Sequence, residues 1–402
     1  MKVTKLLLGL GLATAQMLAI CWVFSGCQQF QTRQAQSQAS SKTRFYPGPP
    51  DKPRLQFLTS ISTESDLGIR RRYSGLERLI AGTEDPTNTE LVGKPYGLAL
   101  YEDKLYICDV QRKLVEVVDL KEKAFKYLSK EQRMVNPVNI CIEKGRKYVA
   151  DPVGGAVFVF GRDDALEAIL GGDLKLKPID VAVRANRCYL TDMNANQVVV
   201  LDVATGKEIR RIGKPGDGDG QFGLIGDIAL DAQENIYVTD KALARVAKFD
   251  PNGTFRSTFG KVGDSIHDFA RPKGIEVDRE GRIWVVDAAS EVVKTYNAEG
   301  QLLMFFGFPG SEPGSTNLPA SVVIDYDNVE LFREHFTEGA QIEFLVLVSN
   351  QYGTKINIYG FGSFPQQEEA MQETATKLRL DLESEPDSES QERPLRPSSH
   401  VP

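Results

Sequence analysis

Short apolar runs with a period of two residues dominate the chain, and one unit of three runs returns six times between residues 95 and 359. Each unit opens with a first apolar run, continues with a second run that in most copies ends in Asp, and closes with a third. The first runs span 95–100, 137–142, 178–183, 226–230, 272–277 and 319–324. Because apolar residues recur at every second position and not about every 3.6, the pattern predicts strands and excludes a helical solenoid.

The spacing of the units indicates the kind of β-protein. The Asp that ends the second run stands at positions 109, 151, 192, 240 and 287, with gaps of 42, 41, 48 and 47 residues. Repeats of about 40 to 50 residues made of short strands are typical of propeller blades. A fourth run that ends in Gly follows several units, for example at 208–213, 254–260 and 301–307. We therefore predict an all-β, six-bladed β-propeller.

The sixth unit lacks a fourth strand, and the segment before the first unit offers a replacement. Residues 54–61 (RLQFLTSI) have the apolar content of such a strand. Pairing this strand into the last blade would remove a free sheet edge and close the ring. The prolines at positions 47, 49, 50 and 53 oppose its extension toward the N-terminus. We predict a propeller closed by an N-terminal strand.

The units resemble the NHL-repeat family, which forms six-bladed propellers of the NHL/TolB-like kind. The likeness spans residues 54–362 and is clearest at Ile236–Gly253 and Pro272–Asp287. The Pro-rich segment followed by Arg54-Leu55-Gln56 is also similar to exported NHL-repeat lipoproteins encoded near multihaem cytochromes in some bacteria. This second resemblance implies a place in the cell envelope but no mechanism.

The first residues have the features of an export signal. A short basic start precedes an apolar run from Leu6 to Phe24, and Ser25-Gly26-Cys27 follows. This resembles a bacterial lipoprotein signal, although that family usually has Leu where this chain has Phe24, and it implies a lipid such as palmitate on Cys27. Acyl chains contribute about 0.8 kcal/mol for each buried CH₂, so two or three of them anchor a protein stably. The alternatives are an uncleaved transmembrane anchor and an ordinary cleaved signal. All three place the body outside the cytoplasm, facing the periplasm or the exterior.

The remaining chain divides into three parts. Residues 28–53, rich in Gln and Ser at first, are predicted to be a flexible tether, and 54–364 the propeller. Residues 365–402 contain nine acidic and four basic residues, which accounts for −5 of the net charge of −7, and are predicted to be a disordered tail. The propeller itself is nearly neutral, so we expect no nucleic-acid partner. Only three cysteines (Cys108, Cys141 and Cys188) follow the leader, too few for a disulfide framework.

Two sets of polar residues recur on the blades. The Asp residues that end the second strands are suited to accept hydrogen bonds from backbone turns, which is a structural role. The alternative is a ring of acids on a ligand-binding face.

The second set lies near the start of each inner strand, at one mouth of the predicted central channel. Its members are Gly97, Asn139, Asp180, Asp227, Gly274 and Ser321. Asn139, Asp180 and Asp227 fall on consecutive blades and offer the oxygen ligands that suit Ca²⁺. Calcium-dependent propeller lactonases have a similar arrangement, which implies a hydrolase with its site in the channel. Gly, Asn and Asp also accept unusual backbone angles, so a structural role without any metal is the alternative.

Two residues further along the inner strands, small side chains prevail. These positions hold Ala99, Cys141, Ala182, Ala229, Glu276 and Val323. Glu276 is the one acid among them and a candidate ligand-binding residue, with channel water as the alternative partner. The chain has three His residues without metal-ligand spacing, no C-x-x-C-H and no G-x-S-x-G. We therefore identify no catalytic residues and no cofactor other than the candidate Ca²⁺.

Two insertions interrupt the repeat, at residues 63–92 and 325–342, and each is suited either to contact a partner or to cover exposed core. We expect an exported, lipid-anchored propeller that serves as a protein- or ligand-binding and assembly platform in the cell envelope. Its expected partners are the membrane, through the lipid, and another envelope or extracellular protein, with extracellular cytochromes as candidates. The alternatives are a Ca²⁺-dependent lactonase-like hydrolase and a peptidoglycan- or polysaccharide-binding protein.

Overall fold

The computed structural model describes residues 44–68, 90–128 and 133–369. The chain divides into two compact units, Met1–Thr43 and Arg44–Pro402, and only the second contains described residues. The predicted leader, Cys27 and residues 28–43 of the tether therefore lie outside the described part. No helix in the described ranges is long and apolar enough to cross a membrane.

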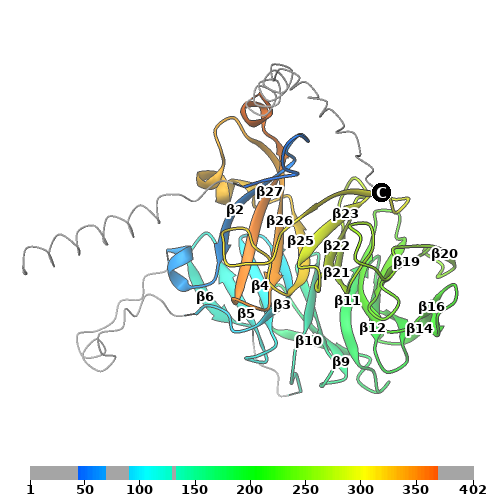
Figure 1. Cartoon of the computed structure of the whole chain (residues 1–402). Coiled ribbons are helices and arrows are strands. Elements are labelled where there is room, and N and C mark those ends of the chain that lie inside the picture. Colours follow the sequence, from blue (N-terminus) through cyan, green and yellow to red (C-terminus); the bar gives the residue numbers. More distant parts are fainter. Residues whose placement is uncertain (1–43, 69–89, 129–132, 370–402) are drawn as a thin grey trace, which may run out of the picture. The chain divides into compact units, whose positions relative to one another are not determined.

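Five blades are antiparallel sheets of four consecutive strands (Figure 1). Blade 1 contains β3 (Pro95–Tyr101), β4 (Lys104–Asp109), β5 (Leu114–Asp119) and β6 (Ala124–Tyr127). Blade 2 contains β7 (Asn139–Glu143), β8 (Arg146–Asp151), β9 (Ala156–Phe160) and β10 (Leu166–Leu170). Blade 3 contains β11 (Pro178–Arg184), β12 (Arg187–Asp192), β13 (Gln197–Asp202) and β14 (Glu208–Ile212).

Blade 4 contains β17 (Ile225–Leu230), β18 (Ile236–Asp240), β19 (Arg245–Phe249) and β20 (Phe255–Phe259). Blade 5 contains β21 (Pro272–Val277), β22 (Ile283–Asp287), β23 (Val292–Tyr296) and β24 (Leu302–Phe306). A short parallel pair, β15 (Lys214–Pro215) and β16 (Gln221–Phe222), lies in the loop between blades 3 and 4. The first strands of successive blades contact one another, and the ring is completed where β25 (Pro319–Asp325) contacts β3. The predicted six-bladed β-propeller is confirmed.

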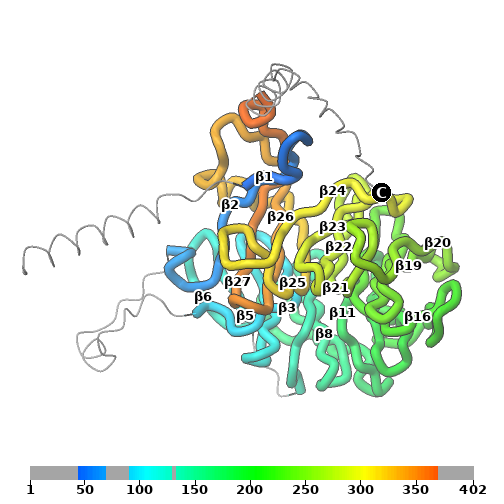
Figure 2. Tube along the Cα trace, viewed as in Figure 1, coloured from blue at the N-terminus to red at the C-terminus, as the bar shows by residue number. Residues whose placement is uncertain are grey.

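The sixth blade is closed by the N-terminal strand. Its order is β1 (Phe45–Tyr46), β2 (Leu55–Ile61), β27 (Lys355–Ser363), β26 (Gln341–Asn350) and β25. Leu55 of β2 pairs with Phe361 of β27, and Ile61 pairs with Ile356. Figure 2 shows this blue strand beside the orange one, so segments from the two ends of the propeller share one sheet. The predicted closure is confirmed.

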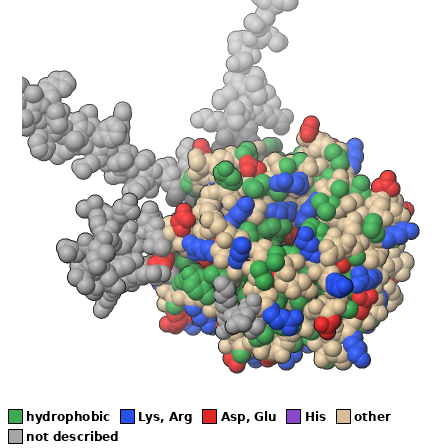
Figure 3. Space-filling model, turned by 90° about the horizontal axis from the view of Figure 1, so that it is seen from below, with side chains coloured by type: hydrophobic (Ala, Val, Ile, Leu, Met, Phe, Trp, Pro, Cys, Tyr) green, Lys and Arg blue, Asp and Glu red, His purple; other side chains and the backbone are tan. Residues whose placement is uncertain are grey.

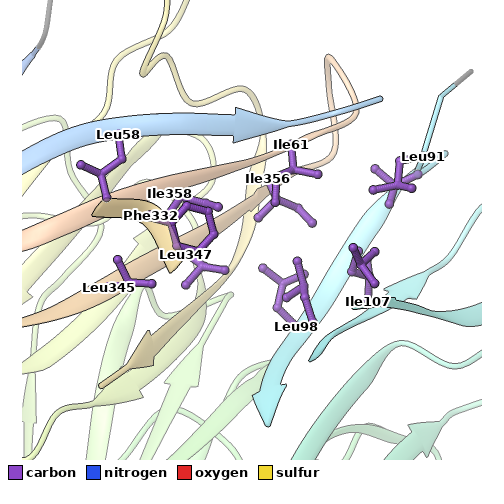
Figure 4. Close-up of a cluster of buried hydrophobic side chains, with 13 residues drawn as sticks. Leu58, Ile61, Leu91, Leu98, Ile107, Phe332, Leu345, Leu347, Ile356 and Ile358 are labelled. Carbon is purple, nitrogen blue, oxygen red and sulfur yellow. The ribbon is translucent and has the colours of Figure 1, made fainter. Parts of the chain in front are cut away.

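The core between blades 6 and 1 is built around this closure (Figure 4). Leu58 and Ile61 of β2 pack with Ile356 and Ile358 of β27 and with Leu98 of β3. Each core side chain removes apolar surface from water, worth about 1.5–3 kcal/mol when a large aliphatic group is fully buried. The closing strand is therefore held by buried side chains as well as by its ladder of hydrogen bonds.

The boundaries predicted for the tether and the tail need correction. The tether was expected to extend to residue 53, but Phe45 and Tyr46 form β1, which pairs with β2. The Phe45 ring lies 5.1 Å from the Phe364 ring, so aromatic packing orders the last part of the segment that was predicted to be a flexible tether. At the other end, residues 365–369 are helical and do not belong to a disordered tail. The tail from residue 370 lies outside the described residues.

The insertion in blade 6 covers core. Its 3-10 helix η3 (Val329–His335) places Phe332 in the cluster of Figure 4. Gln56 of the closing strand donates a hydrogen bond to the His335 carbonyl (2.9 Å) and accepts one from the Thr337 N–H (3.2 Å). Of the other insertion, residues 69–89 lie outside the described part, and η1 (Glu64–Leu67) precedes them.

One end of the ring, which we call the mouth face, is formed by two kinds of loop. These are the turns between the second and third strands of each blade (2→3 turns) and the connections from the fourth strand of one blade to the inner strand of the next (4→1 connections). The Asp at the end of the second strand joins these two kinds of loop. Asp109 accepts hydrogen bonds from the backbone N–H groups of Gln111 and Arg112 in the turn and of Gly93 and Lys94 in the connection. Asp151, Asp192, Asp240 and Asp287 each bind N–H groups of their own connection in the same way. The structural role predicted for this Asp is confirmed.

The sixth blade uses Asn350 at this position. Its Oδ1 accepts a hydrogen bond from the Asn317 N–H (2.8 Å), and its Nδ2 donates to the Val348 carbonyl (3.1 Å). An amide can do both because it carries a donor and an acceptor.

Candidate functional site

A central channel of about 250 Å³ runs between the six inner strands. Six residues, each two positions beyond the first polar position of its inner strand, all line this channel. They are Ala99, Cys141, Ala182, Ala229, Glu276 and Val323. Their small side chains leave the space open, and Arg184 and Glu143 line its far end. Among the described cysteines no disulfide is present, and Cys108 and Cys188 are buried thiols.

Asn139, Asp180 and Asp227 line the channel together at its mouth end, as predicted, and all three are buried. Asp180 Oδ1 accepts a hydrogen bond from the Val181 N–H (2.8 Å), and Oδ2 accepts one from the Ile228 N–H (2.7 Å). Asn139 Oδ1 accepts from the Ile140 N–H (3.1 Å), and its Nδ2 lies 3.5 Å from Asp227 Oδ2.

Burial disfavours the charged forms of both acids. Burial, followed by the negative charge of Asp227, raises the pKa of Asp180 well above its usual value. Burial also raises the pKa of Asp227, while the ammonium groups of Lys241 and Lys273 oppose this shift. Lys241 Nζ lies 3.5 Å from Asp227 Oδ1, and the two groups form an ion pair. This oxygen accepts no hydrogen bond from a described residue.

The three residues fit a calcium ion poorly in this arrangement. Both oxygens of Asp180 and the amide oxygen of Asn139 already accept backbone N–H groups. Asp227 Oδ1 is the one side-chain oxygen of the trio without a hydrogen bond from a described residue. Calcium takes about six to eight oxygen ligands. A search of the described residues finds no group of three His, Cys, Asp or Glu side chains suited to a metal.

The structure explains why glycine stands at positions 97 and 274 of the inner strands, which the sequence did not reveal. None of the six residues of this set has a positive φ, so the expected tolerance of unusual backbone angles is not what selects them. A Cβ on Gly97 would lie 2.5 Å from the Cα of Asn139, and one on Gly274 would lie 2.7 Å from the Cα of Ser321. Neighbouring inner strands approach so closely here that a side chain has no room.

Glu276 lies inside the channel, where its Oε1 accepts a hydrogen bond from the Val277 N–H (3.3 Å). Burial raises its pKa to about 7, although this hydrogen bond and the positive charge of Arg184 oppose the shift. A carboxyl with such a pKa takes up or releases a proton near neutral pH.

Sequence reasoning missed the side chains above the acids, Tyr96 and Lys273. Lys273 Nζ lies 4.2 Å from the centre of the Tyr96 ring and donates a hydrogen bond to Gln351 Oε1 (2.9 Å). Burial lowers the pKa of Lys273 to about 7, and the nearby cations Lys241, Arg271 and Lys94 add to this effect while Asp227 opposes it. Figure 3 shows Lys and Arg side chains around a hollow at the middle of this face. Each of these two residues directly follows an opening proline. The repeat pattern does not constrain the side chain at this position, so the pattern did not single them out.

Exposed apolar side chains also gather on the mouth face. Of the ten large hydrophobic residues exposed in the described ranges, four lie on outer fourth strands, and six lie in loops. The six are Val135, Val153, Leu174, Leu224, Val262 and Tyr352, and all belong to 4→1 connections or 2→3 turns. We call these six the apolar rim. The 1→2 and 3→4 turns of the opposite face hold none of the ten, so the two faces differ in character.

Comparisons with known proteins agree with the fold. A family model described as 6-bladed beta-propeller matches residues 174–250, which span blade 3 and most of blade 4. A solved structure of unknown function from Bacteroides thetaiotaomicron is 17% identical, with a TM-score of 0.54, over 76% of this chain and 75% of that one. A gluconolactonase from Xanthomonas campestris is 14% identical, with a TM-score of 0.52, over 79% of this chain and 94% of that one. At such identities the likeness shows the fold alone.

Proposed function

We propose that the protein is an exported, lipid-anchored propeller that binds another protein of the cell envelope or the extracellular space through its mouth face. The observation that carries this proposal is the apolar rim, in which Tyr352, Val262 and Val153 are 74%, 68% and 62% exposed. Contiguous exposed apolar patches mark protein–protein contacts, and among the described loops large exposed apolar side chains occur on the mouth face alone. The Pro-rich resemblance noted above makes extracellular cytochromes the first candidates for the partner.

The position of the described N-terminus supports this use of the face. Arg44 precedes β1, which pairs with the beginning of β2, and β2 then runs toward the mouth face and ends at Ile61. A chain attached to a membrane through Cys27 would therefore join the propeller at the end away from the apolar rim. The mouth face would remain accessible to a partner.

The rim is tested by capture from envelope extracts with the detergent-solubilised full chain. We expect the variant Val153→Ser, Val262→Ser, Tyr352→Ser to lose most of the protein that the wild type retains. The matched variant Ile209→Ser, Leu303→Ser removes exposed apolar side chains from outer strands and should retain the partner. Equal capture by the wild type and the rim variant would refute the proposed surface.

The anchor is tested separately. Palmitate label should enter the wild-type chain and not Cys27→Ala. A wild-type chain that stays membrane-bound without taking up the label would favour the uncleaved transmembrane anchor.

A further inference from the structure

Three cations on the mouth face occupy one repeated position, directly before the opening proline of an inner strand. Lys94, Lys177 and Arg271 precede Pro95, Pro178 and Pro272, on blades 1, 3 and 5. The backbone N–H of each donates to the Asp that ends its own blade's second strand, at 3.1, 2.7 and 2.8 Å. The Asp residues thus fix three basic residues on alternate blades around the channel mouth.

Among the described residues the side chains of these cations have no polar partner, unlike those of Lys241 and Lys273. Within residues 44–68, 90–128 and 133–369, the side chains of Lys94, Lys177 and Arg271 form no hydrogen bond and no ion pair. Lys241 is paired with Asp227, and Lys273 is bonded to Gln351. Lys94 and Arg271 lie close enough to Lys273 to repel its charged form. Three basic side chains on one face without an ion pair favour an anionic ligand.

We propose that Lys94, Lys177 and Arg271, which we call the cationic collar, bind an acidic, carboxylate-rich segment of the partner protein. The inference rests on the proposed function and specifies the chemistry of the partner. Lys and Arg bind carboxylates through charge-assisted hydrogen bonds. The surrounding apolar rim would contact the aliphatic side chains that flank such a segment.

Other anionic partners fit less well. Five of the six rim residues are aliphatic, whereas bases of single-stranded nucleic acids stack on aromatic rings, and Tyr352 is the one aromatic in the rim. A flat bilayer would meet the protruding loops first. Lys94 and Lys177 are half-buried in the 4→1 connections of the mouth face, where an extended peptide can reach them.

The test is fluorescence anisotropy with the detergent-solubilised full chain and a fluorescein-labelled, glutamate-rich peptide with flanking leucines. The same peptide with glutamine in place of glutamate is the probe control. We expect Lys94→Gln, Lys177→Gln, Arg271→Gln to weaken binding of the acidic peptide about tenfold or more. Binding should also weaken as salt rises, because the Debye length is about 8 Å at physiological ionic strength and about 3 Å at 1 M.

The charge-matched control is Lys121→Gln, Lys144→Gln, Lys207→Gln, whose side chains are exposed on the opposite face. It should bind the acidic peptide as the wild type does, and both variants should unfold at the wild-type temperature. Equal binding of the two peptides, or an equal loss in both variants, would overturn the collar. So would collar-dependent binding to phosphatidylglycerol vesicles without binding of the peptide. If the rim variant loses the captured partner while the peptide fails to bind, the proposed function stands and the collar does not.

Discussion

Asp180 on blade 3 accepts a hydrogen bond from the backbone N–H of Ile228 on blade 4, at 2.7 Å. This residue was the central member of the candidate calcium trio, and the contact gives it a different task. It joins two neighbouring inner strands at the channel mouth, where both groups are buried and water is a poor substitute. Two backbone donors hold this carboxyl group in place, while burial and the charge of Asp227 raise its pKa.

Removing this carboxylate should destabilise the ring. Asp180→Ala leaves the Val181 and Ile228 N–H groups without an acceptor, which we expect to lower the free energy of unfolding by about 1–3 kcal/mol. Urea unfolding of the full chain measures this change in the free energy of unfolding. The control Asp173→Ala, in an exposed loop, should change the value by less than about 0.5 kcal/mol. No difference between the two variants would show that the contact is dispensable.

Calcium should not stabilise the protein. The trio's oxygens are largely occupied, so we expect equal unfolding temperatures in calcium and in a chelator. A resident ion at a hundred times its Kd would add about 2.7 kcal/mol. A clear rise in unfolding temperature with calcium, lost in Asp227→Asn, would restore the hydrolase alternative.

Glu276 should make stability depend on pH. Its folded pKa of about 7 exceeds the ordinary value of 4.5, so between these values the folded state holds a proton that the unfolded state releases. Its contribution is therefore complete below pH 4.5, declines as pH rises, and is lost above pH 7.

Glu276→Gln should remove that decline. We expect the variant to be more stable than the wild type by about 1–3 kcal/mol at pH 8 and equal to it at pH 4. Denaturant unfolding across this range is the measurement, with the exposed Glu299→Gln as the control. A constant difference at all pH values would show that burial does not shift this carboxyl.

Placing the Asp of the other blades at position 350 of blade 6 should destabilise the protein. Asn350→Asp matches the other five blades, but it turns the amide that faces the Val348 carbonyl into a carboxylate oxygen. Repulsion in a buried site should lower the free energy of unfolding by about 1–3 kcal/mol. Asp240→Asn, the reverse change, provides the comparison and should also destabilise, because both oxygens of Asp240 accept backbone N–H groups and an amide NH₂ would face one of these donors. A neutral or stabilising Asn350→Asp would contradict this account of the sixth blade.

The strands and their closure could be predicted because the alternation of apolar residues and the recurring Asp reflect local rules that every blade obeys. Asn350 was missed because β26 is longer than the other second strands and because Asn does not continue the Asp series. Phe45 and Tyr46 were missed because their order depends on contact with Phe364, far along the chain. The collar was missed because Lys94, Lys177 and Arg271 stand directly before the opening prolines, where the repeat pattern does not constrain the side chain.

The mouth face as the binding surface is tested most directly by photo-cross-linking in intact cells. Benzoylphenylalanine replaces Tyr352 on the apolar rim or, as the comparison, Lys207 in a 3→4 turn of the opposite face. We expect a protein adduct from position 352 that decreases when the cationic collar is changed to glutamine, and none from position 207. Adducts formed equally from both positions, or from position 207 alone, would contradict a mouth face that binds the partner.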